Sequence, residues 1–253
     1  MLLIYMKIVA IGGGEIGRPG FPVETTKIDK EIISLTGKKA PRLLFIPTAS
    51  SDSESYYEVV QKHFGKRLGC KTDVLYLINQ KISKEQIEEK VFNSDIIYVG
   101  GGNTAKLMKY WRKTGLDKIL KKAGDKGIVL SGVSAGAICW CKYGISDSRK
   151  FINPNADLFK VSGLGFLNML YCPHADAELD RRSGLKEMMK KTSGIAIAVE
   201  NCCALEVIDN AYRIICSKDK ARACKVYWKN GKFYEEFLNN QKTFKPLSEL
   251  LTK

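Results

Sequence analysis

Residues 128–140, which read IVLSGVSAGAICW, combine a predicted strand, a sharp turn and the start of a helix. The run Ile128–Ser131 is typical of a strand buried on both faces. The next residues follow the pattern Gly-x-Ser-x-Gly, centred on Ser134 and followed by an apolar, helix-like run. Between a strand and a helix, this pattern indicates a nucleophile elbow, in which the turn exposes the serine hydroxyl at the end of the strand. Ser134 is therefore the candidate nucleophile, and a tight packing turn is the alternative interpretation.

Strands and helices alternate on both sides of this stretch. The predicted strands are Lys7–Ile11, Arg42–Pro47, Asp73–Ile78, Asp95–Val99, Ile128–Ser131 and Ile195–Val199. The predicted helices are Glu24–Thr36, Ser53–Leu68, Ser83–Phe92, Thr104–Trp111, Leu116–Ala123 and Leu179–Lys191. Such alternation predicts parallel strands joined by right-handed crossovers, hence an α/β protein with a doubly wound sheet.

The last fifty residues change character. Short strand-like runs at Cys203–Asp209, Ala211–Cys216, Lys225–Trp228 and Lys232–Glu236 are separated by turn residues, among them Asn230-Gly231. They predict antiparallel strands toward the C-terminus. With no linker-like tract or internal repeat in between, we expect residues 1–253 to form a single α/β domain.

The charge of the chain is strongly basic. There are 41 Lys and Arg residues against 27 Asp and Glu residues, giving a formal net charge of +14. Nucleic-acid binding would require these residues to gather on one face, usually within a recognisable module. Instead they form scattered pairs: Lys38-Lys39, Lys66-Arg67, Lys121-Lys122, Arg181-Arg182 and Lys190-Lys191. We therefore expect solvated helix faces and no nucleic-acid partner, with attraction of an acidic substrate as a second reading.

Targeting and cysteine patterns favour the cytoplasm. The apolar start MLLIYMKIVAI is too short to cross a bilayer and lacks the features of a signal peptide. None of the 8 cysteines forms a CxxC pair, so reduced thiols packed as small hydrophobic groups are expected. These patterns predict a soluble cytoplasmic protein without a membrane partner.

Two glycine-rich loops follow predicted strands. Gly12–Gly17 contains GxGxxG, but Pro19 and Pro22 prevent the helix that a dinucleotide site would need. Gly100–Thr104 lacks the ending of a phosphate-binding loop, yet its glycines leave free N–H groups near a helix start, which can stabilise an oxyanion. A non-catalytic module that binds a nucleotide through these loops is the alternative to an enzyme.

A serine nucleophile needs a base, and the chain has only 2 histidines. His63 falls within a predicted helix among Lys62, Lys66 and Arg67, which indicates a solvated surface position. His174 follows Pro173 after an apolar stretch, and is the candidate base.

An acidic side chain should orient the second nitrogen of that histidine. Glu200 ends the predicted strand Ile195–Val199, and we expect it at the same sheet edge as Ser134. Asp147 and Asp176 are competing candidates that spacing does not exclude.

Several of these segments together resemble the dipeptidase E/cyanophycinase family of serine peptidases. The resemblance covers about residues 7–216 and is carried by PTAS at 47–50, GGGNT at 100–104, GVSAGAICW at 132–140, PHAD at 173–176 and the strand ending at Glu200. It implies a fold similar to class I glutamine amidotransferases, a flavodoxin-like three-layer α/β sandwich.

The resemblance also assigns roles to single residues. It implies a Ser-His-Glu triad of Ser134, His174 and Glu200, with Asp147 in support. The N–H groups of Gly102 and Ala135 correspond to the donors of the oxyanion hole. The resemblance implies no metal or organic cofactor.

The expected substrate is a small peptide or peptide-like amide, cleaved through an acyl-enzyme. Dipeptides with N-terminal Asp are one candidate class, and Arg181, Arg182 and Asn103 are the candidate substrate-binding residues. The two arginines do not align cleanly with the basic residues of the aspartyl dipeptidases, and an exposed helix start is the alternative for them. The sequence predicts neither the exact substrate nor the oligomeric state.

Overall fold

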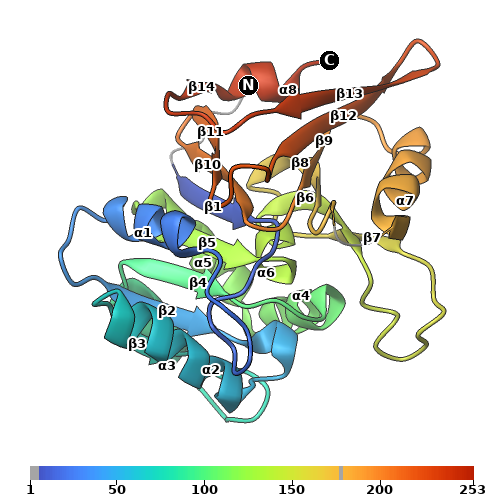
Figure 1. Ribbon diagram of the computed structural model, residues 1–253. Helices are drawn as coiled ribbons and strands as arrows, with labels where there is room; N and C mark the ends of the chain where they lie inside the picture. The colour runs from blue at the N-terminus through green and yellow to red at the C-terminus, as the bar shows by residue number, and fades with distance from the viewer. Residues whose placement is uncertain (1–5, 177–178) are drawn as a thin grey trace.

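The computed structural model describes residues 6–176 and 179–253, with the backbone alone at residues 179 and 180. Figure 1 shows strands in two sheets, with helices around the lower one. The helices are α1 (Thr26–Ser34), α2 (Glu54–Val60), α3 (Lys84–Phe92), α4 (Thr104–Thr114), α5 (Leu116–Asp125), α6 (Ala135–Ile138), α7 (Leu179–Lys190) and α8 (Leu247–Leu251), with a 3-10 turn η1 (Thr48–Ser50) and a π-helical turn η2 (Gln61–Arg67).

The first sheet has the order β14-β11-β10-β1-β5-β4-β2-β3. Its strands are β1 (Lys7–Ile11), β2 (Arg42–Ile46), β3 (Lys71–Val74), β4 (Ile96–Val99), β5 (Val129–Val133), β10 (Cys203–Ile208), β11 (Ala211–Cys216) and β14 (Lys245–Pro246). The five strands from β1 to β3 along this order run parallel. From β1 outward, β10, β11 and β14 pair in antiparallel fashion. The predicted α/β architecture with antiparallel strands toward the C-terminus is confirmed.

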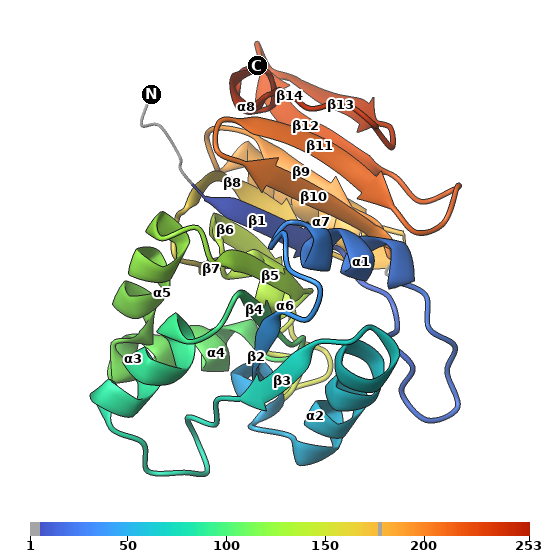
Figure 2. The ribbon, with the colours of Figure 1, turned by 90° about the vertical axis from the view of Figure 1, so that its left-hand side faces the viewer.

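Alternating residues of the parallel strands explain the layers. Ile8 and Ala10 belong to one buried cluster with residues of α3, α4 and α5, whereas Val9 and Ile11 belong to another with residues of α1, α2 and η2. Figure 2 shows these two helix groups on opposite sides of the sheet. Because successive side chains of a strand point to opposite faces, a strand covered on both faces must be apolar throughout.

The second sheet was not expected. It has the order β13-β12-β9-β8-β6-β7, formed by β6 (Cys141–Ser146), β7 (Phe159–Ser162), β8 (Leu167–Cys172), β9 (Ala196–Val199), β12 (Ala223–Lys229) and β13 (Lys232–Leu238). The predicted strand Ile195–Val199 therefore lies here as β9, and not in the sheet that carries Ser134. The strands β6, β7 and β8 were not predicted, because Lys142, Lys160 and Asn168 interrupt their apolar runs.

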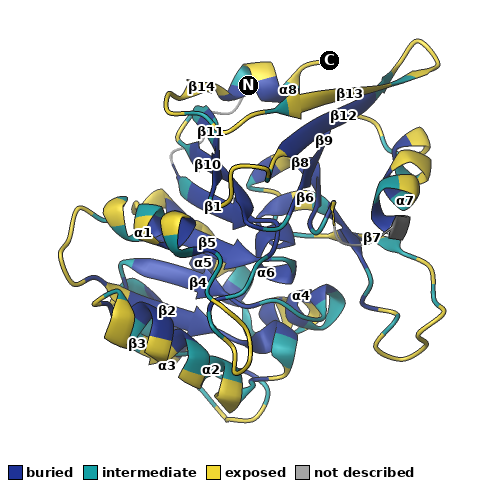
Figure 3. Cartoon of the chain, viewed as in Figure 1, coloured by how far each residue is buried: buried dark blue, intermediate teal, exposed yellow. Residues whose placement is uncertain are grey.

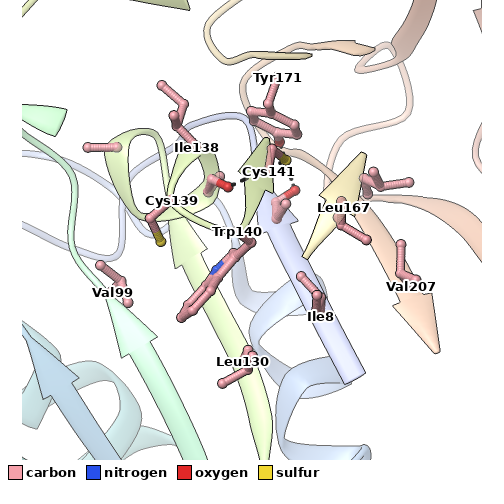
Figure 4. Close-up of a cluster of buried hydrophobic side chains, with 14 of the residues drawn as sticks. Ile8, Val99, Leu130, Ile138, Cys139, Trp140, Cys141, Leu167, Tyr171 and Val207 are labelled. Carbon is pink, nitrogen blue, oxygen red and sulfur yellow. Dashed lines mark hydrogen bonds between the residues drawn. The ribbon is translucent and has the colours of Figure 1, made fainter. Parts of the chain in front are cut away.

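The two sheets share one hydrophobic core. Trp140 and Tyr171 are fully buried among side chains of both sheets (Figure 4), and the Tyr171 hydroxyl donates to the carbonyl of Ala10 on β1 at 2.8 Å. This contact joins β8 of the second sheet to β1 of the first, and so brings the ends of strands from both sheets together.

Figure 3 shows exposed residues on the outer faces of the helices, in the loops and along β13. Lys38, Lys39, Lys66, Arg67, Lys121, Lys122, Lys190 and Lys191 are all exposed. All eight cysteines are free and buried, as expected. Within the described residues, no helix combines the length and the apolar character that crossing a membrane would require.

Candidate active site

The turn at Ser134 has the geometry of a nucleophile elbow. Ser134 adopts φ 56° and ψ −111°, between β5 and α6, and its N–H donates to the carbonyl of Ile11 at 3.0 Å. A non-glycine residue in this region is strained by about 1–3 kcal/mol. The flanking glycines make room, because a Cβ at Gly132 would lie 2.4 Å from the Gly136 carbonyl and one at Gly136 would lie 2.1 Å from the Val99 carbonyl.

His174 meets this serine. The Nε2 atom of His174 lies 2.9 Å from Ser134 Oγ, although 40 residues separate the two in sequence. The histidine follows β8 with φ 53°, and its N–H donates to the Gly12 carbonyl at 3.2 Å. The end of β8 in the second sheet thus brings the His174 ring to the end of β5 in the first sheet.

Asn201 contacts the other nitrogen of the ring. Its Oδ1 atom lies 2.8 Å from His174 Nδ1. An amide oxygen can only accept, so this bond requires Nδ1 to carry the proton and leaves the lone pair of Nε2 for the Ser134 hydroxyl. The arrangement therefore sets the tautomer that a general base needs.

Glu200 does not contact His174, which corrects the expected triad. Its Oε1 atom lies 3.3 Å from guanidinium nitrogens of both Arg182 and Arg222, and its Oε2 accepts the Arg222 N–H at 3.0 Å. Glu200 and Asn201 both follow the end of β9, and of the two it is Asn201 whose side chain contacts the ring.

The two competing carboxylates, Asp147 and Asp176, have other partners than His174. Asp176 Oδ1 accepts the backbone N–H of Asn201 at 2.8 Å and so positions the residue that contacts the ring. Asp147 lies 3.4 Å from Arg181.

The candidate substrate-binding residues all make contacts within the protein. Arg181 is only 2% exposed and donates to the Ile145 carbonyl, which contradicts the alternative of an exposed helix start. Arg182 donates to the Ala175 carbonyl at 3.2 Å and pairs with Glu200. Asn103 caps α4, where its Oδ1 accepts the Lys106 N–H at 2.8 Å. None of the three lines the pocket beside Ser134.

His63 is buried and not solvated. It is 2% exposed, and its Nε2 lies 2.8 Å from the carboxylate of Asp29, which also accepts the Thr25 hydroxyl at 2.7 Å. The lysines around His63 are exposed, but the helix turns this side chain inward toward α1.

Two backbone N–H groups are available beside the serine. Among the described residues, neither Gly102 nor Ala135 uses its N–H in a hydrogen bond within the protein. Gly102 has φ 133°, and a Cβ there would lie 2.5 Å from the Ala49 carbonyl, so the loop requires glycine. An unused N–H is what an oxyanion donor needs, so Gly102 and Ala135 stay candidates for that role.

The first glycine loop packs against the site. A Cβ at Gly13 would lie 1.9 Å from Asn201 Oδ1 and 2.5 Å from His174 Nδ1, and a Cβ at Gly12 would lie 2.3 Å from the Glu200 carbonyl. Close approach of the backbone to the histidine and its partner thus accounts for Gly12 and Gly13, without a bound nucleotide.

A pocket of about 940 Å³ opens from Ser134 and His174. One wall is the loop after β1, in which Ile16 pairs with Val23 as a small hairpin, and another is the N-terminal part of α2 with Tyr56. Asn201, Gly13 and Tyr56 were not among the site residues predicted from the sequence. Three glycines in a row after β1 were a signal for close packing, but no local pattern pointed to the asparagine or the tyrosine.

Comparison with known proteins identifies the family to which the chain belongs. The family model described as Peptidase family S51 matches residues 8–215. The chain belongs to peptidase family S51. Like its family it is a peptidase, and the expected resemblance is confirmed.

Individual relatives include proteins that are named as peptidases. The chain is 36% identical over 224 residues to the "Uncharacterized peptidase YgaJ" of Bacillus subtilis (strain 168), covering 87% of this chain and 91% of that protein. It is 30% identical over 114 residues to "Peptidase E" of Nostoc sp. (strain PCC 7120), with 44% of each chain covered. The crystal structure of a peptidase from an acI-B1 Actinobacterium superposes with a TM-score of 0.71 at 21% identity, covering 96% of this chain and 97% of that one, which shows a shared fold.

Proposed function

We propose that this S51 member is a serine peptidase of small peptides, with Ser134 as nucleophile, His174 as general base and Asn201 as the residue that orients His174. The observation that carries the proposal is the 2.9 Å contact between Ser134 Oγ and His174 Nε2 on the strained elbow. The Asn201 contact supports it because it leaves Nε2 unprotonated and facing the hydroxyl.

The reaction follows from these positions. Ser134 Oγ bonds to the carbonyl carbon of the peptide while its proton passes to His174 Nε2. The N–H groups of Gly102 and Ala135 stabilise the negative oxygen of the tetrahedral intermediate. Nε2 then gives its proton to the leaving amine as the C–N bond breaks. Water, deprotonated by the same nitrogen, releases the acyl group and restores the serine.

The pocket is consistent with a small substrate. Its 940 Å³ would hold a short peptide rather than a folded protein segment. Binding of an acidic side chain by Arg181 and Arg182, one of the candidate roles for these residues, gains no support because both arginines are engaged away from this pocket. Dipeptides with N-terminal Asp are therefore one class to test among many.

The decisive experiment is labelling with a fluorophosphonate probe, combined with a dipeptide-library screen. We expect the wild type to be labelled at Ser134 and to cleave a subset of dipeptides, while Ser134→Ala and His174→Ala fold normally and lose turnover by several orders of magnitude. Wild-type activity in either variant would overturn the mechanism. Nucleotide binding without labelling would favour the non-catalytic alternative.

A further inference from the structure

The ring of Tyr56 is held against the loop that carries Gly101 and Gly102. It packs on Phe45 with ring centroids 5.0 Å apart, and a Cβ at Gly100 would lie 2.9 Å from its Cε1. Because no side chain fits at Gly100, the backbone of this loop and the tyrosine ring are in direct contact. The ring is thereby fixed beside the proposed oxyanion donors.

Tyr56 and Gly101 both line the pocket that holds Ser134, and the Tyr56 hydroxyl is the atom that meets the Gly101 N–H. It lies 3.5 Å from the N–H of Gly101, whose own Cα is close to the nucleophile, since a Cβ there would lie 3.5 Å from Ser134 Cβ. The Gly101 N–H points to a lone pair of the phenol oxygen. The phenol proton has no acceptor in the part of the chain that the structure describes.

This hydroxyl keeps its proton over the working range of pH. Burial raises the pKa of Tyr56 to about 12; the Gly101 N–H opposes this rise, and the nearby carboxylate of Glu15 adds to it. A neutral phenol whose proton is not used within the protein can donate a hydrogen bond to a ligand bound in the pocket.

We propose that the Tyr56 hydroxyl donates a hydrogen bond to the backbone oxygen of the bound peptide that flanks the reacting carbonyl; in a dipeptide this is an oxygen of the C-terminal carboxylate. This inference rests on the proposed function and adds a substrate-binding residue to it. Gly101 separates the hydroxyl from Gly102, so the phenol contacts a part of the peptide that flanks the reacting carbonyl. Such a contact is made equally in the ground state and the transition state, and therefore acts on KM rather than on kcat.

The neighbouring tyrosine offers a matched control. Tyr57 lies on the same helix and its ring stacks on the same Phe45 at 6.3 Å, but its hydroxyl donates to the Thr72 carbonyl and it does not line the pocket. Tyr56→Phe and Tyr57→Phe each remove one oxygen and leave the ring, so both are expected to fold.

The test is the kinetics of both variants with the dipeptide that the wild type cleaves fastest, together with thermal unfolding. Tyr56→Phe is expected to raise KM about tenfold, the effect of one lost hydrogen bond, with kcat within about twofold of the wild type. Tyr57→Phe should keep both constants. Binding of the same dipeptide to Ser134→Ala, with and without Tyr56→Phe, should show the same tenfold loss in affinity.

Three results would overturn the inference: unchanged kinetics in Tyr56→Phe, an equal loss in both variants, or a fall in kcat with KM unchanged. The first would mean that the hydroxyl meets no substrate, the second that only the ring cluster matters, and the third that Tyr56 acts on the reacting carbonyl. Failure of the proposed function has a different signature. The wild type itself would then show neither dipeptide cleavage nor fluorophosphonate labelling, and the role of Tyr56 would fall with it.

Discussion

The residue that orients His174 is an amide and not a carboxylate. Asn201 holds Nδ1–H through one neutral hydrogen bond, and Asp176 holds the backbone of Asn201 in turn. A neutral partner fixes the ring and its tautomer, but stabilises the imidazolium less than a charged carboxylate would. Orientation is thus the main contribution that we expect from Asn201.

This assignment predicts different outcomes for two adjacent residues. Asn201→Ala should lower kcat about tenfold or more, because the imidazole loses the bond that sets its tautomer and angle. Glu200→Gln should leave kcat within about threefold and act mainly on stability, since Glu200 pairs with Arg182 and Arg222. Steady-state kinetics and thermal unfolding of both variants decide the matter. A large loss in Glu200→Gln with an active Asn201→Ala would restore Glu200 to the site.

The residue types in the sequence predicted a serine and a histidine in the site, but they did not show which residue contacts Nδ1 of the histidine. With two histidines in the chain, Ser134 and His174 could be paired by elimination. Choosing between Glu200 and Asn201 required the direction of each side chain at the end of β9. That direction depends on register and on the turn after the strand, which composition does not reveal.

At the scale of elements, a buried pair joins α1 to η2. His63 and Asp29 are both almost inaccessible, and the second oxygen of Asp29 and Nδ1 of His63 have no partner among the described residues. Burial raises the pKa of Asp29, while the hydrogen bond from His63 opposes that rise. The pair therefore links two helices that cover the same face of the first sheet.

Removing one partner should be costly. We expect His63→Ala to lower the free energy of unfolding by about 3–5 kcal/mol, because Asp29 is left buried without its partner. The double variant Asp29→Asn/His63→Ala should recover part of this loss, since no uncompensated charge remains. Urea unfolding measures both, and Lys121→Ala, which breaks the exposed Lys121–Asp125 pair, is a control expected within about 0.5 kcal/mol of the wild type. A small effect of His63→Ala would show that the pair adds little.

Strands with an unbroken local pattern were predicted with good bounds. The predicted Lys7–Ile11 and Ala211–Cys216 coincide with β1 and β11. The strand expected at Asp73–Ile78 is shorter in the structure, as β3 at Lys71–Val74. In the second sheet, β9, β12 and β13 were predicted, whereas β6, β7 and β8 were missed because polar residues interrupt their apolar runs.

At the scale of the whole molecule, the site forms where two sheets meet. Ser134 follows β5 of the first sheet, whereas His174 and Asn201 follow β8 and β9 of the second. Gly12 and Gly13, at the end of β1, lie between them. The geometry of the site therefore depends on the packing of one sheet on the other.

The basic surface is dispersed. The exposed lysine and arginine pairs lie after α1 and on η2, α5 and α7. We expect a 20-base-pair duplex to bind no more tightly than about micromolar at physiological salt, with binding lost as salt rises, and not to inhibit dipeptide cleavage. Fluorescence anisotropy at two salt concentrations tests this. Saturable nanomolar binding would contradict the prediction and assign the charge a nucleic-acid partner.

The sequence by itself determined the alternation of strands and helices, the elbow at Ser134, the choice of His174 and the membership of the family. Each of these depends on local periodicity, on a short motif or on the scarcity of one residue type. Only the tertiary structure decided that Asn201 and not Glu200 contacts His174, that Arg181 and His63 are buried, and that Tyr56 lines the same pocket as Ser134. Those facts depend on contacts between residues far apart in the chain, which form when the two sheets and the helices pack and leave no local pattern in the sequence.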